Sequence, residues 1–380
     1  MMQEAQQITG YATRLKQAGG SVYFVGIGGI GMSALARYFN EHGVPVYGYD
    51  RTATPLTRQL EAEGMHIHYE ENVDLIPADV QLVVYTPAIP STNLELQYLQ
   101  QKGYTLHKRS DVLQQITNSS LNICIAGTHG KTTISTMTGH LLRHSGYGCN
   151  AFIGGISVNY GRNFWSSPNN VTVVEADEYD RSFLKLQPFI AVITSMDPDH
   201  LDIYGTPAEM EAAFIAFSRQ VLPNGWLIVK HGLARMDDLR AEQCISYHLT
   251  DNRAHVHTTA VAVGNGGYTF DVQLQLPGKP AHSITGLQLY AGGLHNVENL
   301  LPAITVGHLL GVPDAQIKAA VSAYRGVKRR FEFVLAPGEG QVVLIDDYAH
   351  HPEELRALIS GVRSLFAGYR LLLVFQPHLY

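Results

Sequence analysis

The sequence predicts an α/β protein that consists of two parallel-sheet domains and the beginning of a third α/β domain. Two glycine-containing turns, at residues 26–31 and 127–133, indicate this fold class, because each follows a short apolar run and precedes a helix-like stretch. Other short apolar runs end in polar loops, which is typical of strands buried in a parallel sheet. A chain of 380 residues is too long for one ordinary core, so two or three domains are expected.

Composition excludes several classes of protein. The chain is 45% hydrophobic and carries a formal net charge of −6, which argues against a nucleic-acid partner, since such proteins normally show a basic face. No apolar run approaches the ~20 residues of a membrane helix. The first residues lack the basic and apolar regions of a secretory signal. Because Cys124, Cys149 and Cys244 form neither a disulfide framework nor a zinc motif, we expect a reduced, cytoplasmic protein without a membrane partner and leave its oligomeric state open.

The first glycine-containing turn predicts a Rossmann-like domain. Residues 22–27 are an apolar run that predicts a buried parallel strand, and residues 32–42 predict the helix after it. Between them, residues 26–31 (G-I-G-G-I-G) fit the G-x-G-x-x-G pattern, which places backbone N–H groups and a helix N-terminus against a phosphate. The pattern alone does not distinguish NAD from a nucleotide sugar.

Two further strands are expected in this domain. Val46–Tyr49 ends in Asp50, close to the position of the ribose-binding acid in a dinucleotide fold. Asp50 is equally consistent with a helix N-cap or a solvated loop acid. Val80–Tyr85 precedes the loop 86–90 (T-P-A-I-P), and ligands of such sheets bind at the carboxyl ends of the strands.

The second turn predicts a P-loop at the start of a second domain, after a polar stretch at 117–122 that resembles a linker. An apolar run at 123–126 and a helix at 134–144 enclose G-T-H-G-K-T-T. This is a short form of the P-loop, since Ile125 stands where the longer pattern has its first glycine. Backbone N–H groups would face the phosphates, Lys131 adds a point charge, and the Thr132 hydroxyl can bind Mg²⁺. The alternative is a helix-capping turn without a ligand.

Carboxylates gather after the apolar run at 171–174. Residues 175–180 (E-A-D-E-Y-D) hold four of them, which would repel one another unless a cation or a basic partner offsets their charge. Beside a P-loop the expected cation is Mg²⁺, bound by Thr132 and by an acid at the end of a neighbouring strand. A solvated acidic turn is the alternative. The next run, 190–194, leads to His200, which is therefore expected at the same end of the sheet as Glu175.

A hairpin and a helix are expected next. Residues 256–263 and 268–276 alternate in polarity on either side of an Asn-Gly-Gly turn at 265–267, which predicts a β-hairpin. An apolar helix is expected over residues 295–310. Asn296 and Asn299 share one face near its start, and helix capping is the alternative role for Asn296.

The last part of the chain predicts a domain junction and the start of a third domain. A basic cluster at 327–332 marks the junction. Strands are expected at 342–345 and 370–375, with a helix at 353–364 between them.

Taken together, the motifs resemble those of the Mur ligases, the ATP-dependent enzymes that build the peptide stem of bacterial peptidoglycan. The resemblance spans essentially the whole chain and rests on six segments in the family's order: G-T-H-G-K-T-T, E-A-D-E-Y-D, D-P-D-H-L-D, H-N-V-E-N, K-R-R-F-E and D-D-Y-A-H-H-P. Within the family, G-I-G-G-I-G-M-S-A-L-A and F-Q-P-H resemble the member that adds L-alanine. No lysine lies between Lys185 and Lys230, whereas the members with a carbamylated lysine need one in this region.

The resemblance implies a cell-wall ligase with small-molecule substrates. ATP would phosphorylate the carboxylate of UDP-N-acetylmuramate, and the amine of L-alanine would attack the acyl phosphate and release phosphate. Both carboxylate and phosphate are anions, so cations must screen their approach. The related murein-tripeptide recycling ligase is the first alternative, and an NAD-dependent oxidoreductase or a non-catalytic ATP switch are alternatives from other classes.

The resemblance also implies the site residues. ATP would contact Gly127, Thr128, His129, Gly130, Lys131, Thr132, Thr133, Asn296, Arg330, Asp347 and Tyr348. UDP-N-acetylmuramate would contact Gly28, Gly29, Ile30, Gly31, Asp50, Thr86 and Arg109. Mg²⁺ would be bound by Thr132, Glu175 and His200, and catalysis would rest on Lys131, Glu175, His200 and Arg330.

Three domains follow from the same resemblance. Residues 1–117 would form a Rossmann-like domain that binds UDP-N-acetylmuramate, and residues 118–330 a central P-loop ATPase-type domain. Residues 331–380 would begin the C-terminal domain, which we expect to be truncated, because members of the family continue well past the F-Q-P-H motif.

Overall fold

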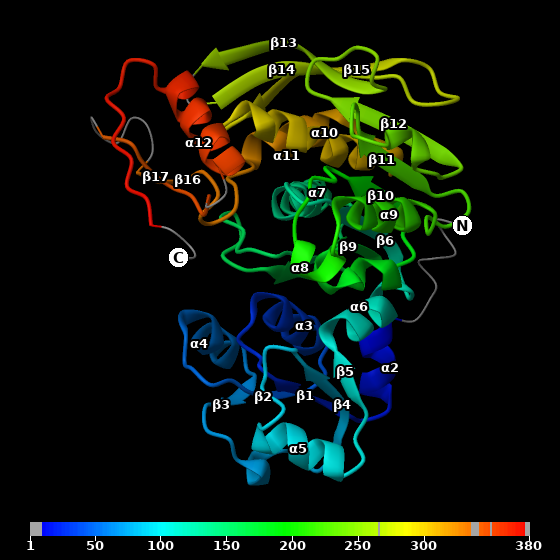
Figure 1. Cartoon of the computed structure of the whole chain (residues 1–380), viewed down its shortest axis with the longest axis vertical. Coiled ribbons are helices and arrows are strands. Elements are labelled where there is room, and N and C mark those ends of the chain that lie inside the picture. Colours follow the sequence, from blue (N-terminus) through cyan, green and yellow to red (C-terminus); the bar gives the residue numbers. More distant parts are fainter. Residues whose placement is uncertain (1–9, 265–266, 336–341, 350–351, 377–380) are drawn as a thin grey trace.

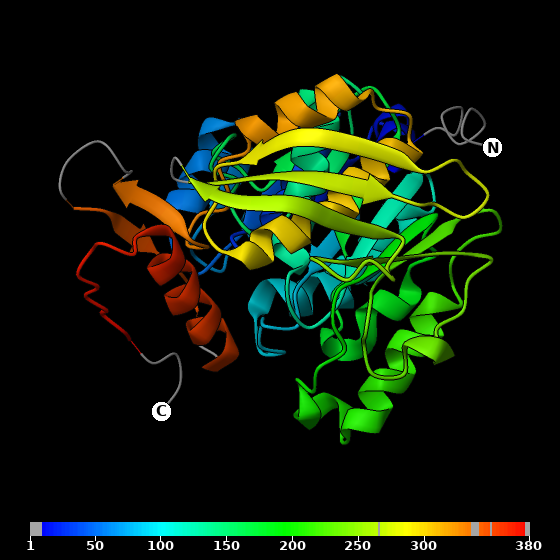
Figure 2. The same ribbon diagram turned by 90° about the horizontal axis from the view of Figure 1, so that it is seen from above.

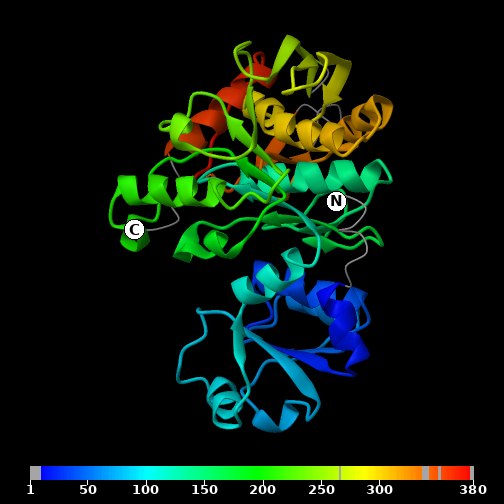
Figure 3. The same ribbon diagram turned by 90° about the vertical axis from the view of Figure 1, so that its right-hand side faces the viewer.

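The computed structural model describes residues 10–264, 267–335, 342–349 and 352–376. Figure 1 shows an N-terminal sheet with its helices (blue to cyan), a larger central sheet (cyan to yellow) and a small C-terminal unit (orange to red). The side view in Figure 3 shows the N-terminal part stacked beneath the central part. No helix in the ranges given above has the length and the apolar character that a membrane span requires.

The N-terminal sheet is entirely parallel, with the strand order β3-β2-β1-β4-β5. Its central strand, β1, is buried along its whole length, as the apolar run predicts. The strands are β1 (Ser21–Val25), β2 (Val46–Tyr49), β3 (His66–His68), β4 (Val80–Tyr85) and β5 (Leu106–Lys108), and the helices are α2 (Tyr11–Gln17), α3 (Ile30–Glu41), α4 (Pro55–Ala62), α5 (Leu94–Gln101) and α6 (Arg109–Thr117).

The central sheet has ten strands in the order β15-β14-β13-β12-β11-β10-β6-β9-β7-β8. Its middle is parallel, and β6 is buried at every position, whereas β13, β14 and β15 extend one edge as antiparallel strands. The strands are β6 (Leu121–Ala126), β7 (Asn150–Phe152), β8 (Phe164–Trp165), β9 (Val171–Glu175), β10 (Ile190–Ile193), β11 (Trp226–Lys230), β12 (Gln243–His248), β13 (Val256–Gly264), β14 (Gly267–Leu274) and β15 (His282–Leu289).

Five α-helices belong to this part of the chain: α7 (Lys131–His144), α8 (Leu201–Tyr204), α9 (Pro207–Ser218), α10 (Leu294–Leu309) and α11 (Asp314–Ala323). Figure 2 shows the three antiparallel strands (yellow-green to yellow) lying across α10 and α11. The antiparallel pairing of β13 with β14 confirms the predicted hairpin, although the turn residues Asn265 and Gly266 lie outside the described residues.

The C-terminal unit consists of the antiparallel pair β16 (Glu332–Leu335) and β17 (Leu344–Asp346), followed by α12 (Pro352–Leu365). The predicted strand at 370–375 is wrong, since the described residues there adopt no regular structure. Leu372 is 81% exposed and Val374 is 90% exposed, because no described strand lies alongside to pair with their backbone. Two motifs lie partly outside the described residues: D-D-Y-A-H-H-P at His350 and His351, and F-Q-P-H at Pro377 and His378.

The predicted linker at 117–122 lies where the N-terminal part passes into the central part, but it is shorter than predicted. Thr117 is the last residue of α6, and Leu121 already begins β6. Most of the polar side chains there bind within the protein, whereas Asn118 is exposed. The Thr117 hydroxyl donates to the Leu113 carbonyl at 3.0 Å, and Asn122 Nδ2 donates to the carbonyls of Thr117 and Gln187 at 3.1 Å each. Polarity therefore indicated the position of the connection but not that most of its side chains are bound within the protein.

A buried polar network joins the N-terminal sheet to the central sheet. Arg37, on α3, is completely buried and donates two hydrogen bonds to the Glu63 carboxylate, at 2.8 and 3.0 Å. Its third nitrogen donates to Asn163 Oδ1 from the central part. Asn163 Nδ2 in turn donates to the Ile30 carbonyl at 2.6 Å and to Ser33 Oγ at 2.9 Å. These bonds fix α3, which begins at the first glycine turn, against the central sheet.

Candidate active site

The second glycine turn connects β6 to α7 and is held from the neighbouring strand. Gly130 has a φ of 84° and is the N-cap of α7. A side chain at Gly127, where φ is 135°, would overlap Thr194, so only glycine fits this position. Ser195 follows β10, and its Oγ accepts from the His129 N–H at 2.9 Å and lies 2.8 Å from the Thr128 hydroxyl. The turn thus has a defined shape at a helix N-terminus, which favours an anion.

Lys131 is paired with a buried carboxylate. Its Nζ donates to Glu178 Oε1 and to the Gly127 carbonyl, each at 2.7 Å. The Glu178 side chain is 1% exposed, and its Oε2 has no hydrogen-bond partner among the described residues. Burial raises the pKa of Glu178, while the Lys131 charge acts in the opposite direction. The sequence pattern named Glu178 as one of four acids but did not single it out, because only the fold brings it to Lys131.

Glu175, at the end of β9, binds the start of α7. Thr132 Oγ1 donates to Glu175 Oε2 at 3.2 Å, and Ser135 Oγ donates to Oε1 at 3.1 Å. The Gly154 N–H also donates to Oε1, at 2.5 Å. The predicted pairing of Thr132 with an acid at the end of a neighbouring strand is therefore present in the structure.

His200 lies next to the same acids, as its place in the sequence predicts. It is the N-cap of α8 and has a left-handed φ of 50°. Its Nε2 lies 3.9 Å from Glu178 Oε1 and 3.6 Å from Asp199 Oδ2, and its ring contacts Tyr179 edge-on at a centroid distance of 5.1 Å. Lys131 and His200 therefore both lie near the same oxygen, Glu178 Oε1.

A cavity of about 360 Å³ lies beyond the turn, and the C-terminal unit forms one of its walls. Its walls include His129, Gly130 and Thr133 from the turn and Asn296 and Asn299 from α10, as well as Arg330, Asp347, Tyr348, Glu354, Ala357 and Leu358. Seven of the predicted ATP-binding residues, drawn from separate parts of the sequence, thus line one space.

Backbone contacts hold the polar groups of this cavity. Asn296 Nδ2 donates to the Gly292 carbonyl at 2.5 Å, and Asn299 Nδ2 lies 3.4 Å from Asn296 Oδ1. The capping alternative for Asn296 is wrong, since Gly293 is the N-cap of α10. Asp347 accepts from the N–H groups of Phe331 and Ala349 at 2.6 and 2.7 Å, and burial raises the pKa of this carboxyl.

In the N-terminal sheet, Asp50 braces the first glycine turn. Its Oδ2 accepts from the Gly28 N–H at 2.7 Å, and a Cβ at Gly28 would lie 2.7 Å from the same oxygen. Asp50 is therefore not a helix cap, and Thr54 caps α4 instead. Thr86 packs against Gly26, where a Cβ would lie 2.7 Å from Thr86 Cγ2, so its side chain supports the base of the turn.

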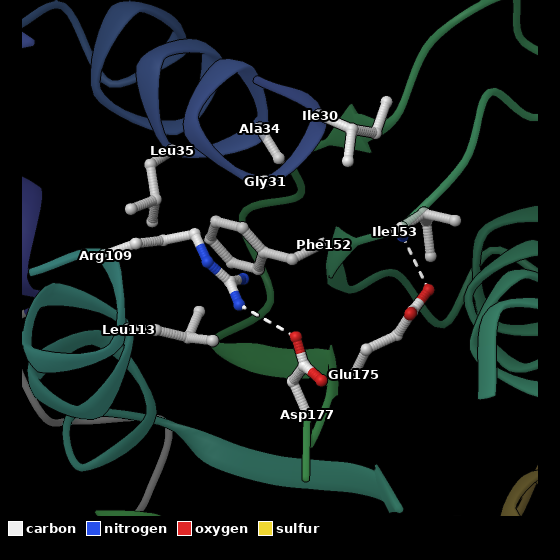
Figure 4. Close-up of a pocket in the computed structure, with 11 residues that line it drawn as sticks. Ile30, Gly31, Ala34, Leu35, Arg109, Leu113, Phe152, Ile153, Glu175 and Asp177 are labelled. Atoms are coloured by element: carbon white, nitrogen blue, oxygen red, sulfur yellow. Dashed lines mark hydrogen bonds and ion pairs between the residues drawn. The ribbon is translucent and has the colours of Figure 1, made fainter. Parts of the chain in front are cut away.

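A second cavity, of about 270 Å³, lies between the N-terminal and central sheets (Figure 4). It is lined on the N-terminal side by Ile30, Gly31 and Arg109. From the central sheet it is lined by Glu175, the last residue of β9, and by Asp177. Arg109 Nη2 lies 3.5 Å from Asp177 Oδ2 across this space. Arg109 also covers Gly31, where a Cβ would lie 2.8 Å from its Cδ.

Comparison with known proteins decides the family. Residues 21–120 match the Mur ligase family, catalytic domain, residues 125–307 match the Mur ligase middle domain, and residues 329–378 match the Mur ligase, glutamate ligase domain. The UDP-N-acetylmuramate–L-alanine ligase of Phocaeicola vulgatus is 45% identical over 367 residues, covering 95% of this chain and 78% of that protein. The chain belongs to the Mur ligase family.

Other Mur ligases agree in sequence and in fold. The UDP-N-acetylmuramate–L-alanine ligase of Parabacteroides distasonis is 46% identical over 367 residues, covering 95% of this chain and 78% of that protein. The solved UDP-N-acetylmuramate-alanine ligase of Thermotoga maritima is 28% identical, with a TM-score of 0.79 over 92% of this chain and 78% of that chain. A murein peptide ligase from Psychrobacter arcticus, 24% identical, shares the fold with a TM-score of 0.74, over 92% of this chain and 77% of that chain.

Glu175 links the two cavities of this Mur ligase through its hydrogen bond to Thr132. That side chain lines the cavity between the sheets, and its hydrogen-bond partner Thr132 is followed directly by Thr133, which lines the cavity beyond the turn. The structure therefore brings Lys131, Thr132, Glu175 and His200 to one end of the central sheet. Asp50 and Thr86 are not part of this group. They contact the first glycine turn, at Gly28 and Gly26 respectively.

Proposed function

We propose that this Mur ligase joins L-alanine to the carboxylate of UDP-N-acetylmuramate, with ATP as the source of energy, in peptidoglycan synthesis. The high identity to two ligases of that name supports the substrates. The observation that carries the chemistry is the hydrogen bond between Glu175, which lines the cavity between the sheets, and Thr132, which is next to the cavity beyond the turn. An acyl phosphate requires the γ-phosphate and the carboxylate to meet, and this contact lies between their proposed sites. The compartment proposed is the cytoplasm.

The proposed roles follow the geometry. Lys131 binds the β- and γ-phosphates once it leaves Glu178, and the N-terminus of α7 adds backbone N–H donors. Asn296 faces the adenine from α10, while Arg330, Asp347 and Tyr348 approach the nucleotide from the junction and the C-terminal unit. The diphosphate of the uridine nucleotide is bound by the first glycine turn, at Gly28, Gly29, Ile30 and Gly31. Asp50 and Thr86 support this turn, and Arg109 is directed at the muramyl carboxylate.

The donor set near Glu175 fits Mg²⁺. A hydroxyl and carboxylates suit this hard cation, and Thr132 and Glu175 already form a hydrogen-bonded pair. We assign Thr132 and Glu175 to an ATP-linked ion and His200 to a substrate-side ion. Bound Mg²⁺ would supply the positive charge that lets two anions approach each other.

The proposed division into domains is residues 1–117 for UDP-N-acetylmuramate, 118–330 for ATP, and 331–380 as the start of a C-terminal domain. Two structural features support it. The first boundary coincides with the end of α6, and the second falls directly before β16.

The first experiment is a calorimetric panel of ligands. UDP-N-acetylmuramate and ATP–Mg²⁺ are expected to bind the chain, and NAD and NADP are expected to give no heat, because Lys131, Glu175 and His200 serve no purpose in a nicotinamide site. Saturable NAD binding would overturn the assignment. A parallel assay of amine-dependent phosphate release, with mass detection of the product, compares L-alanine with L-Ala-γ-D-Glu-meso-diaminopimelate. Release with the tripeptide alone would identify the recycling ligase instead.

Glu175→Gln is expected to raise the Mg²⁺ requirement by about 10-fold or more, since the variant removes a charged metal ligand and leaves the phosphate-binding turn intact. Titration of Mg²⁺ at fixed ATP measures this change. Asp180→Asn is the matched control, because Asp180 is an exposed acid of the same segment that accepts from the Ser182 N–H and does not contact Thr132. An unchanged Mg²⁺ requirement in Glu175→Gln would make Glu175 a purely structural carboxylate.

A further inference from the structure

Three metal-binding side chains meet on the face of the protein opposite the nucleotide end of α10. They are His282 at the start of β15, His308 in the last turn of α10, and Asp314, the first residue of α11. One ligand atom from each lies within 4.8 Å of the other two. His282 Nε2 is 2.9 and 3.1 Å from the two Asp314 oxygens, and the rings of His282 and His308 stack with centroids 4.9 Å apart.

The chemistry of this cluster differs from that of the Mg²⁺ site. Two imidazoles and one carboxylate are the donors that zinc and neighbouring transition metals prefer, whereas Mg²⁺ takes mostly oxygen donors, such as those of Thr132 and Glu175. The side chains of His282 and Asp314 are 38% and 40% exposed, so water can complete the coordination. His308 is half-buried, and its ring lies against that of His282, so its position is fixed beside the other two donors.

We propose that His282, His308 and Asp314 form a surface site for a divalent transition-metal ion of the zinc type. The site is separate from the catalytic centre, since Asn296 and His308 are twelve positions apart on one helix, about 18 Å at 1.5 Å per residue. A bound ion would connect the end of α10, the start of α11 and the start of β15. Its effect is therefore on the stability of the folded state, because a ligand that binds only that state raises its unfolding temperature.

A plain ion pair between His282 and Asp314 is the competing explanation. Two positive charges oppose a metal ion here: Lys279, whose charge acts on His308, and Lys318, which lines the same surface hollow as Asp314. An ion pair would need no third group, however. It does not explain why a ring nitrogen of His308 lies within 4.8 Å of a donor atom of both His282 and Asp314, or why the two rings stack. The two explanations differ in their response to added metal.

The test is zinc calorimetry on the full chain after treatment with a chelator. Since His200 and other histidines can also bind zinc, the decisive quantity is the difference in stoichiometry between variants. His282→Ala and His308→Ala are each expected to bind one equivalent fewer than the native chain. His66→Ala, at an exposed position on β3, is the control and should keep the full stoichiometry. Zinc should also raise the unfolding temperature of the native chain more than that of either cluster variant.

Asp314→Asn provides a variant that preserves shape. It is expected to weaken zinc binding at this site by about 10-fold or more while near-UV circular dichroism stays unchanged. Cobalt(II) gives a second readout, since its visible absorption should lose the component contributed by this site in all three cluster variants. Equal zinc stoichiometry in the native chain, His282→Ala and His308→Ala would overturn the proposal and leave the ion pair as the explanation.

Discussion

Lys131→Ala is expected to reduce L-alanine-dependent phosphate release by about 10²–10³-fold, the usual cost of removing one preorganised donor to a developing anion. The same change should lower the free energy of unfolding by about 3–5 kcal/mol, because it leaves the buried Glu178 carboxylate without its cation. Steady-state kinetics and urea unfolding measure the two effects separately.

The double variant Lys131→Ala with Glu178→Gln distinguishes the two roles of the lysine. Removing the buried charge together with its partner should restore most of the lost stability, since a neutral amide has a smaller desolvation cost than a carboxylate. Activity should stay low, because no charge replaces the ammonium at the phosphates. Recovery of activity in the double variant would show that Lys131 serves only to neutralise Glu178.

Arg37→Met is expected to lower the free energy of unfolding by about 3 kcal/mol. The variant removes a fully buried guanidinium that binds Glu63 and Asn163, and both partners then lose hydrogen bonds inside the protein. Arg162, whose Nη2 lies 3.1 Å from Glu63, compensates in part. Because these bonds join two sheets, we expect limited proteolysis to cut near the junction of α6 and β6 sooner than in the native chain.

Arg58→Met is the matched control for Arg37→Met. Arg58 also pairs with a glutamate, Glu61 at 3.1 Å, but its side chain is 64% exposed. An exposed pair of this kind is worth about 0–1 kcal/mol. Equal losses of stability in the two variants would mean that burial of the Arg37 network has no special weight.

The sequence predicted the parts of the fold in which local signals agree. Of the apolar runs that were predicted as strands, β1, β6 and β10 are buried at every position, β9 at all but its last residue and β4 at four of six, so their composition is unambiguous. Short or edge strands such as β3, β5, β7 and β8 were not found, because two or three residues carry no measurable periodicity. The predicted strand at 370–375 was wrong because local pattern does not reveal whether a backbone finds a partner. For the same reason the linker at 117–122 was predicted longer than it is, since Leu121 and Asn122 already belong to β6.

The candidate site was predictable where a motif fixes chemistry and spacing together. The pairing of Thr132 with an acid, and the approach of His200 to the same end of the sheet, follow from strand order in a parallel sheet. The partnership of Lys131 with Glu178 could not be predicted, since the four acids of residues 175–180 look alike in sequence and only folding buries one of them. The cluster of His282, His308 and Asp314 is likewise assembled from three elements that share no motif.

Two helices, α7 and α10, begin at the same cavity, where Gly130 and Asn296 both line the wall. A Cβ at Gly130 would lie only 3.2 Å from Asn299 Oδ1, so the two N-termini nearly touch. The positive ends of both helix dipoles therefore point to this cavity and oppose the four carboxylates that also line it, Asp197, Glu298, Asp347 and Glu354, as well as the formal net charge of −6. If the helix N-termini govern the approach of nucleotide, we expect added salt to slow its association, whereas the net charge alone would have salt speed it up.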